Sequence, residues 1–146
     1  MRVIVQRVSS AAVRVGGEVV GSIGPGLVAL VGVGRDSTDE DAAWLAAKTV
    51  DLRIFGDEQG RMNRSLRDVG GAVLAISQFT LYGDVSRGRR PSFVGAAEPA
   101  EGERLYRVYC DALDAPVERG VFGAHMEIDL RADGPVTIVL SRTSAG

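Results

Sequence analysis

Few side chains in this sequence are of the types that usually carry out hydrolytic chemistry. His125 is the only histidine, it precedes an apolar run, and the sequence offers it no obvious partner that could orient it as a general base. A lone histidine of this kind is more often structural or exposed than catalytic, so we expect no catalytic role for it. Cys110 is the only cysteine, so the chain can form neither an intrachain disulfide nor a cysteine-based metal cage, and a reducing compartment fits.

The common hydrolase and nucleotide-binding motifs are also missing. The sequence contains no G-x-S-x-G elbow and no G-x-x-x-x-G-K-[ST] loop. Gly32-Val33-Gly34 follows an apolar run but lacks the third glycine and the helix start of a dinucleotide site. A zinc site would need at least a second histidine with an acid. We therefore expect neither a metal nor a cofactor.

Ser77-Gln78-Phe79-Thr80-Leu81 is an unusual segment, because a buried apolar run ends there in hydroxyl and amide groups. One reading is a strand that simply enters a turn. The other is a pocket wall, in which backbone N–H groups lie beyond the last ladder pair and Phe79 offers a stacking surface. The residues alone leave both readings open.

Two further segments could contact a ligand. Ser86-Arg87-Gly88-Arg89-Arg90-Pro91-Ser92-Phe93 carries guanidinium groups that pair well with phosphate, although charge alone favours a solvated loop. Gly134-Pro135-Val136-Thr137 predicts a turn before the last strand. An X-Pro bond is cis in only about 5–6% of folded cases, and composition does not decide this one.

Length and composition predict one globular domain over residues 1–146, with a tail over about 142–146. Hydrophobic residues make up 45% of the chain and charged residues 25%. The net charge of −2 argues against a general nucleic-acid coat, so any RNA contact must be local. No run approaches the roughly 18 apolar residues of a membrane helix, and the amino-terminal run is interrupted too early for a signal peptide. We expect a soluble cytoplasmic protein without a membrane partner.

The order of predicted elements indicates an α+β fold with a largely antiparallel sheet and two main helices. The first helix starts near Thr38, whose hydroxyl caps it, and the second has Pro99 in its first turn. The apolar stripe of the second helix consists of Leu105, Tyr109, Ala112 and Leu113. The run 27–33 is apolar on both faces, which predicts a strand covered on both sides. The predicted strands cover residues 2–8, 11–15, 18–23, 27–33, 53–55, 72–79, 126–130 and 136–140.

Taken together, the unusual segments resemble the D-aminoacyl-tRNA deacylase family from Met1 to about Leu140. Ser77-Gln78-Phe79-Thr80 matches the family's S-Q-F-T motif, and Ala132-Asp133-Gly134-Pro135-Val136-Thr137 resembles its N-x-G-P-V-T motif. The supporting matches are Gln6-Arg7-Val8, Arg61-Met62-Asn63 and Arg89-Arg90-Pro91-Ser92-Phe93. The departure is Ala132, which stands where the family has an asparagine that could brace the turn.

The resemblance implies a homodimer that hydrolyses the ester bond of D-aminoacyl-tRNA at its 3′-terminal adenosine. It implies that the Gly134-Pro135 bond is cis and that this turn enters the pocket formed by the partner's S-Q-F-T segment. The turn's carbonyl oxygens would hold the α-ammonium of a D-aminoacyl ester and clash with the Cβ of an L-residue, and Arg7 would fix the turn. It assigns catalysis to Ser77, Gln78, Phe79 and Thr80. It assigns substrate binding to Arg7, Met62, Ser92, Phe93, Met126, Gly134, Pro135, Val136 and Thr137.

Without an activating base, Ser77 and Thr80 are poor nucleophiles. We therefore expect N–H groups around Gln78 and Phe79 to stabilise the oxyanion while water attacks, with help that the resemblance implies from the ribose 2′-hydroxyl. Glycine has no Cβ to reject, so glycyl-tRNA should also be cleaved. The rival readings are a non-catalytic RNA-end binding module that uses Arg87, Arg89 and Arg90, a related deacylase for mischarged L-aminoacyl-tRNA, and an inactive structural dimer.

Overall fold

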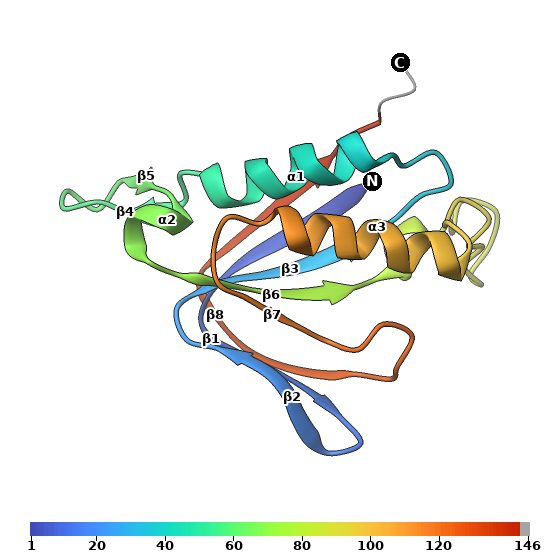
Figure 1. The fold of residues 1–146 in the computed structure, drawn as a ribbon, viewed down its shortest axis with the longest axis horizontal. Coiled ribbons are helices and arrows are strands. Elements are labelled where there is room, and N and C mark those ends of the chain that lie inside the picture. Colours follow the sequence, from blue (N-terminus) through green and yellow to red (C-terminus); the bar gives the residue numbers. More distant parts are fainter. Residues whose placement is uncertain (144–146) are drawn as a thin grey trace.

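The structure, a computed structural model, describes residues 1–143 (Figure 1). Within that range no helix has the length and apolar run needed to cross a membrane. In chain order the elements are β1 (Arg2–Val15), β2 (Glu18–Ile23), β3 (Gly26–Gly32), α1 (Asp39–Asp51), β4 (Phe55–Gly56), β5 (Met62–Arg64), α2 (Leu66–Val69), β6 (Ala72–Ser77), the 3₁₀ helix η1 (Phe79–Tyr82), α3 (Pro99–Ala112), β7 (Val117–Arg119) and β8 (Glu127–Ser141).

The main sheet is largely antiparallel, as expected, but it is mixed, because two of its five strand pairs are parallel. Its strands follow the order β2-β1-β3-β6-β7, and β8 also pairs with β1. The pairs that β1 makes with β2, β3 and β8 are antiparallel, whereas the β3–β6 and β6–β7 pairs are parallel. Parallel neighbours need a crossover connection. Here α1 leads from β3 towards β6 and α3 leads from β6 to β7, so both predicted main helices are confirmed and both act as crossovers.

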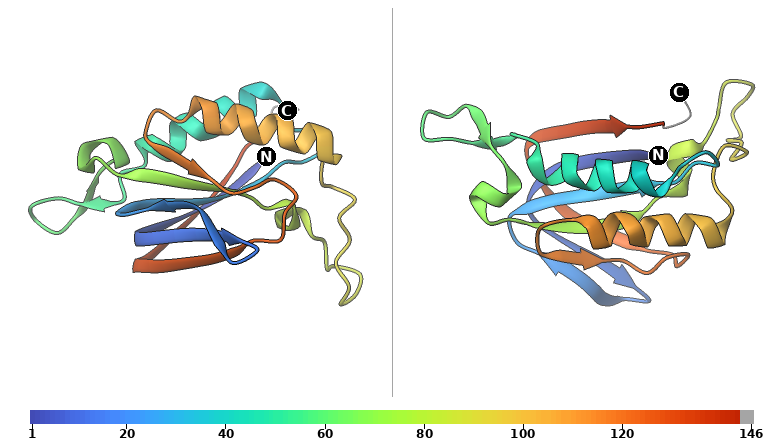
Figure 2. Two further views of the ribbon diagram at one scale, coloured as in Figure 1. Left: turned by 60° about the horizontal axis from the view of Figure 1, so that its bottom comes forward. Right: turned by 45° about the horizontal axis from the view of Figure 1, so that its top comes forward.

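β1 and β8 are each one long strand where two shorter strands were predicted. β1 pairs with β3 over its first half and with β2 over its second half. Its pairing with β8 shifts register between Gln6 and Val8 and again between Val8 and Ser10. Irregularities of this kind bend a strand without ending it. The bend carries the second half of β1 and the strand β2 beneath the sheet, on the face opposite to the helices (Figure 2).

This curl covers the second face of β3, and the prediction that this strand is buried on both sides is confirmed. Leu27, Ala29 and Val31 belong to the cluster that includes the buried residues of α1 and α3. Val28 points the other way and belongs to a second cluster with Val13 of the curled β1. Residues alternate between the two faces of a strand, so a strand between two apolar layers must be apolar at every position.

The cap predicted for the first helix is confirmed. The Thr38 hydroxyl accepts a hydrogen bond from the Asp41 N–H at 3.1 Å, and the Asp41 carboxylate accepts one from the Thr38 N–H at 3.0 Å. This reciprocal pair satisfies amides that have no acceptor inside the helix. The first helix therefore begins where the sequence places it.

The second main helix begins at Pro99 as predicted, but its buried stripe is wider than expected. Ala112 is exposed, whereas Tyr106 and Cys110 are buried beside Leu105 and Tyr109. Two rows of residues four apart therefore face the sheet, Leu105 with Tyr109 and Tyr106 with Cys110. The prediction of Ala112 as a core residue was wrong.

Several boundaries differ from the prediction. The strand expected at 53–55 is Phe55–Gly56, and the strand expected to reach residue 79 ends at Ser77. The short elements β5, α2 and β7 were not predicted, since elements of three or four residues are too short for a periodic pattern.

The predicted tail begins too early. The Arg142 guanidinium pairs with Glu40 at 3.2 Å and lies 4.9 Å from the centre of the Trp44 ring. Residues 144–146 lie outside the described part of the chain.

A steric prediction follows from the close β3–β6 pair. A Cβ on Gly26 would lie 1.9 Å from the carbonyl oxygen of Ala72. Because backbone cannot move aside cheaply, Gly26→Ala should lower the free energy of unfolding by about 2–3 kcal/mol, measured by urea titration. Gly24→Ala is the control, since a Cβ there meets nothing within 4 Å, and it should change stability by less than about 0.5 kcal/mol. Equal stability of the two variants would contradict the close approach of these two strands.

Candidate functional site

The segment Ser77–Thr80 lies where β6 ends beside β3. Ser77 pairs with Val31, and the Gln78 N–H donates to the Val31 carbonyl at 2.7 Å. The Gln78 N–H is therefore engaged and cannot stabilise an oxyanion, which corrects that part of the expectation. The next amides, of Phe79 and Thr80, open the 3₁₀ helix η1, and the first amides of a helix have no acceptor within it. The unpaired donors begin one residue later than predicted.

Arg2 holds the far end of η1, a role that no motif indicated. Its guanidinium donates to the Leu81 carbonyl at 2.8 Å and lies 4.4 Å from the centre of the Tyr82 ring. A Cβ on Gly32 would lie 3.1 Å from the Gln78 carbonyl oxygen, so glycine lets β3 approach the turn closely. The turn is thus fixed from two sides by the first and third strands.

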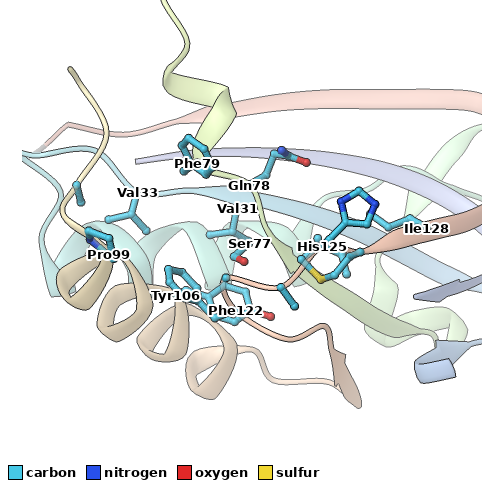
Figure 3. Close-up of a pocket in the computed structure, with 16 residues that line it drawn as sticks. Val31, Val33, Ser77, Gln78, Phe79, Pro99, Tyr106, Phe122, His125 and Ile128 are labelled. Carbon is cyan, nitrogen blue, oxygen red and sulfur yellow. The ribbon is translucent and has the colours of Figure 1, made fainter. Parts of the chain in front are cut away.

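A pocket of about 440 Å³ opens beside this turn. Figure 3 shows Ser77 near its middle, with Val33 and Pro99 towards one end and His125 and Ile128 towards the other. Of the predicted site residues, Ser77, Gln78, Phe79 and Met126 line it. Its remaining lining residues are Val31, Val33, Ile76, Ala97, Pro99, Gly102, Tyr106, Phe122, Gly123, Ala124, His125 and Ile128.

Thr80, Ser92 and Phe93 do not line this pocket, although they lie next to it in the fold. Thr80 is exposed, and its hydroxyl accepts a hydrogen bond from the side-chain amide of Gln78. The Phe93 ring packs against the Phe79 ring in an edge contact, with centroids 5.0 Å apart. Ser92 forms a backbone pair with Asp84 in the loop that follows η1.

The pocket has no group prepared to act as a strong acid or base. Burial raises the pKa of the Tyr106 phenol, whose hydroxyl donates to the Ala75 carbonyl at 2.7 Å. This phenol is therefore neutral and structural. His125 is exposed as predicted, and no residue within 1–143 forms a hydrogen bond or ion pair with it. Its place in the pocket wall was not foreseen. No group of three or more acidic, His or Cys side chains in that range is arranged to hold a metal ion.

A second set of predicted residues gathers around the turn in β8. The Gly134-Pro135 peptide bond is cis, as the resemblance implied, and both residues are exposed. Arg7 donates to the Asp133 carbonyl at 3.1 Å and to the Ile54 carbonyl at 2.6 Å. Arg7 thus ties the turn to the segment before β4, as expected of a residue that fixes its orientation.

The other predicted members of this set are Val136 and Thr137, which follow the turn in β8, and Met62, which lies in β5. Val136 is half-buried against the hydrophobic cluster that includes the buried residues of α1 and α3. Thr137 pairs with Gln6 of β1. Met62 lies in β5, which pairs with β4, and its side chain is 58% exposed. The site residues predicted from the sequence therefore fall into two groups.

Within one chain these groups lie at opposite ends of β3. Leu27 of β3 pairs with Arg7, whereas Val31 pairs with Ser77. Four residues of strand separate the two positions, about 13 Å at the usual rise per residue. Figure 1 likewise shows β4 and β5 at the end of the molecule opposite to the loop that follows η1. A single chain does not bring both motifs into one pocket.

Comparison with known proteins identifies the family. The family model for D-Tyr-tRNA(Tyr) deacylase matches residues 4–141. A D-aminoacyl-tRNA deacylase from Symbiobacterium thermophilum is 57% identical over 143 residues, covering 96% of this chain and 95% of that protein. A deacylase of the same name from Deinococcus radiodurans is 55% identical and covers 96% of this chain and 99% of its own length.

A solved structure adds a close match in three dimensions. A protein named c-Myc DNA Unwinding Element Binding Protein superposes with a TM-score of 0.93 at 35% identity, over 99% of this chain and 100% of that one. The family match spans both motifs, the S-Q-F-T turn and the Gly-Pro turn. The chain belongs to the D-Tyr-tRNA(Tyr) deacylase family.

Proposed function

We propose that this protein hydrolyses the ester bond of D-aminoacyl-tRNA, releasing free D-amino acid and tRNA, and so removes D-residues before they enter translation. The family match and the relatives named D-aminoacyl-tRNA deacylase support this activity. The observation that carries it here is the S-Q-F-T turn, which presents two unpaired amides beside an apolar pocket. The rival RNA-binding module would give no turnover of D-aminoacyl-tRNA.

Catalysis in this proposal rests on the backbone of the turn. The N–H groups of Phe79 and Thr80 stabilise the negative charge that develops on the ester carbonyl oxygen as water attacks. Within residues 1–143 neither the Ser77 nor the Thr80 hydroxyl forms a hydrogen bond with a basic side chain, and the Thr80 hydroxyl already accepts from the Gln78 side-chain amide. An aminoacyl ester is labile, so positioning and charge stabilisation suffice, with the ribose 2′-hydroxyl of the terminal adenosine assisting.

The proposal also assigns the Gly134-Pro135 turn to the partner's pocket in a homodimer. Because the two motif groups lie about 13 Å apart along β3 in one chain, a site built from both needs a second copy. β8 offers a surface on which a second copy of the chain can dock. Within residues 1–143 it pairs only with β1, so its other edge is open, and Leu130 and Val139 on it are 37% and 70% exposed.

Selection between mirror forms then follows from main-chain geometry. Carbonyl oxygens of the turn hold the α-ammonium of the substrate, and an L-residue in the same pose drives its Cβ into them. Arg7 keeps the turn in place through the Asp133 carbonyl. In this proposal Met62, Val136 and Thr137 bind the substrate from the side of the turn, and Met126, Ser92 and Phe93 bind it from the side of the receiving pocket.

The first prediction from this proposal compares the loss of the Phe79 ring with the loss of the Phe79 backbone N–H. Phe79→Ala removes the ring and keeps the N–H, whereas Phe79→Pro removes both. Proline suits the first position of a helix, and the preceding Gln78 lies outside the helical region, with φ −144° and ψ 79°. Loss of an oxyanion donor should make kcat of the proline variant about 10²–10³ lower than that of the alanine variant.

Deacylation of D-tyrosyl-tRNA in single-turnover assays measures this difference. Ser77→Ala and Thr80→Ala serve as controls and should each retain most activity. Complete loss in a folded Thr80→Ala protein would instead support a side-chain nucleophile.

The second prediction concerns the amino acid. Since rejection acts on Cβ, glycyl-tRNA should be cleaved along with D-tyrosyl-tRNA, and L-tyrosyl-tRNA should survive. Parallel assays on the three charged tRNAs at equal enzyme concentration measure this. A glycyl-tRNA that resists cleavage entirely would rule out selection by exclusion, and equal cleavage of both tyrosyl enantiomers would remove the chiral role.

The third prediction tests the shared site by mixing two inactive variants. Gly134→Val blocks the turn, because even a Cβ there would lie 3.0 Å from the Arg7 guanidinium, and φ is +122°. Phe79→Pro blocks the pocket. After subunit exchange, half the dimers are mixed and each has one intact site, so the mixture should regain about a quarter of wild-type activity.

Thermal melts and sedimentation should first show that each variant folds and dimerises. A mixture that stays inactive although mixed dimers form would place both parts of the site in the same chain.

A further inference from the structure

Arginines without a partner concentrate in one loop. The chain has 17 basic residues, and most of their side chains pair with acids, carbonyls or aromatic rings. Within residues 1–143, the basic residues whose side chains form no hydrogen bond, ion pair or ring contact are Arg61, Arg87, Arg89, Arg90 and Arg131. Three of these five lie in the loop 83–95, which we call the arginine loop.

The arginine loop is held firmly at its base, next to the pocket. Asp84 and Ser92 exchange two backbone hydrogen bonds of 2.7 and 2.9 Å, and the Gly83 N–H donates to the Thr80 carbonyl at 2.9 Å. The Phe93 ring packs on Phe79 of the pocket wall. Three extended residues reach about 10 Å, so the arginines lie within roughly that distance of the Asp84–Ser92 pair.

The single acid of the loop does not neutralise these arginines. The Asp84 carboxylate accepts from the Ser86 N–H at 2.9 Å, and this hydrogen bond lowers the pKa of Asp84. It therefore stays ionised and bound to its own loop backbone. The loop is left with an excess of positive charge on a protein whose net charge is −2.

We propose that the arginine loop binds phosphodiester groups of the tRNA acceptor strand, close to the esterified 3′ end. Guanidinium groups pair with phosphate through two parallel hydrogen bonds, and Gly88 between them leaves open space, since a Cβ there meets nothing within 4 Å. Because the protein as a whole is acidic and three of its five unpaired arginines lie here, attraction is concentrated at this edge, which directs the strand end into the adjoining pocket. This inference rests on the proposed deacylase function.

The test compares two substrates that carry the same ester. D-tyrosyl-tRNA has the phosphate backbone, whereas 3′-D-tyrosyl-adenosine lacks it. The variant Arg87→Gln/Arg89→Gln/Arg90→Gln should lose at least about tenfold in kcat/KM on the tRNA at low salt, and its activity on the nucleoside ester should not change. The slope of log kcat/KM against log salt should become shallower by about 2, as three phosphate contacts predict.

Two further variants control for charge. Arg67→Gln/Arg107→Gln/Arg119→Gln removes the same charge from two exposed arginines and one half-buried arginine that pair with acids elsewhere, and it should behave like wild type. Replacement of the three loop arginines by lysine should keep most of the salt slope. Equal losses on both substrates, or equal losses in the two glutamine variants, would overturn the proposal.

Failure of the proposed function gives a different result. In that case the wild-type protein would cleave neither substrate. Fluorescence anisotropy with uncharged tRNA would still test the arginine loop. The loop glutamine variant should bind at least about tenfold more weakly than wild type at low salt, and unchanged affinity would refute the phosphate contact.

Discussion

The hydrogen bond from the Gln78 N–H to the Val31 carbonyl is the contact on which the site depends. It is the last rung of the ladder between β3 and β6, at 2.7 Å, and the chain turns into η1 directly after it. A sheet ends in donors that have no ladder partner, and here these donors are the amides of Phe79, which lines the pocket, and of Thr80, the next residue. Had the ladder continued by one further rung, the Thr80 N–H would be consumed by the sheet, because N–H groups alternate between the two sides of a strand.

One strand supports both motif groups. Arg2, at the start of β1, holds the end of η1 through the Leu81 carbonyl, and Arg7, further along the same strand, holds the Gly-Pro turn through the Asp133 carbonyl. Two guanidinium groups that point to main-chain carbonyls thus position the two halves of the proposed site. A strand buried between two neighbours is rigid, so the distance between the halves is well defined.

The electrostatics of the pocket agree with chemistry done by backbone dipoles. Tyr106 is held neutral by burial, and the walls are largely apolar. In such surroundings an N–H dipole interacts more strongly with a developing negative charge than it does in water. Positive charge lies outside, on the arginine loop, where a polyanion can be attracted without altering the reacting groups.

The sequence by itself determined the family, the two motifs, the cap of α1, the start of α3 at Pro99 and the two-sided burial of β3, because each depends on local residue types and short periodicities. It could not show that β1 and β8 each run on as one strand, nor that α1 and α3 are crossovers in a mixed sheet, because pairing partners are set by long-range packing. The pocket walls supplied by Tyr106, Phe122 and His125 and the bracing by Arg2 also needed the tertiary structure, since residues far apart in the chain meet there without any shared motif. The separation of Arg7 and Ser77 along β3 is of the same kind: both motifs are legible in the chain, but only the folded sheet decides how far apart they lie.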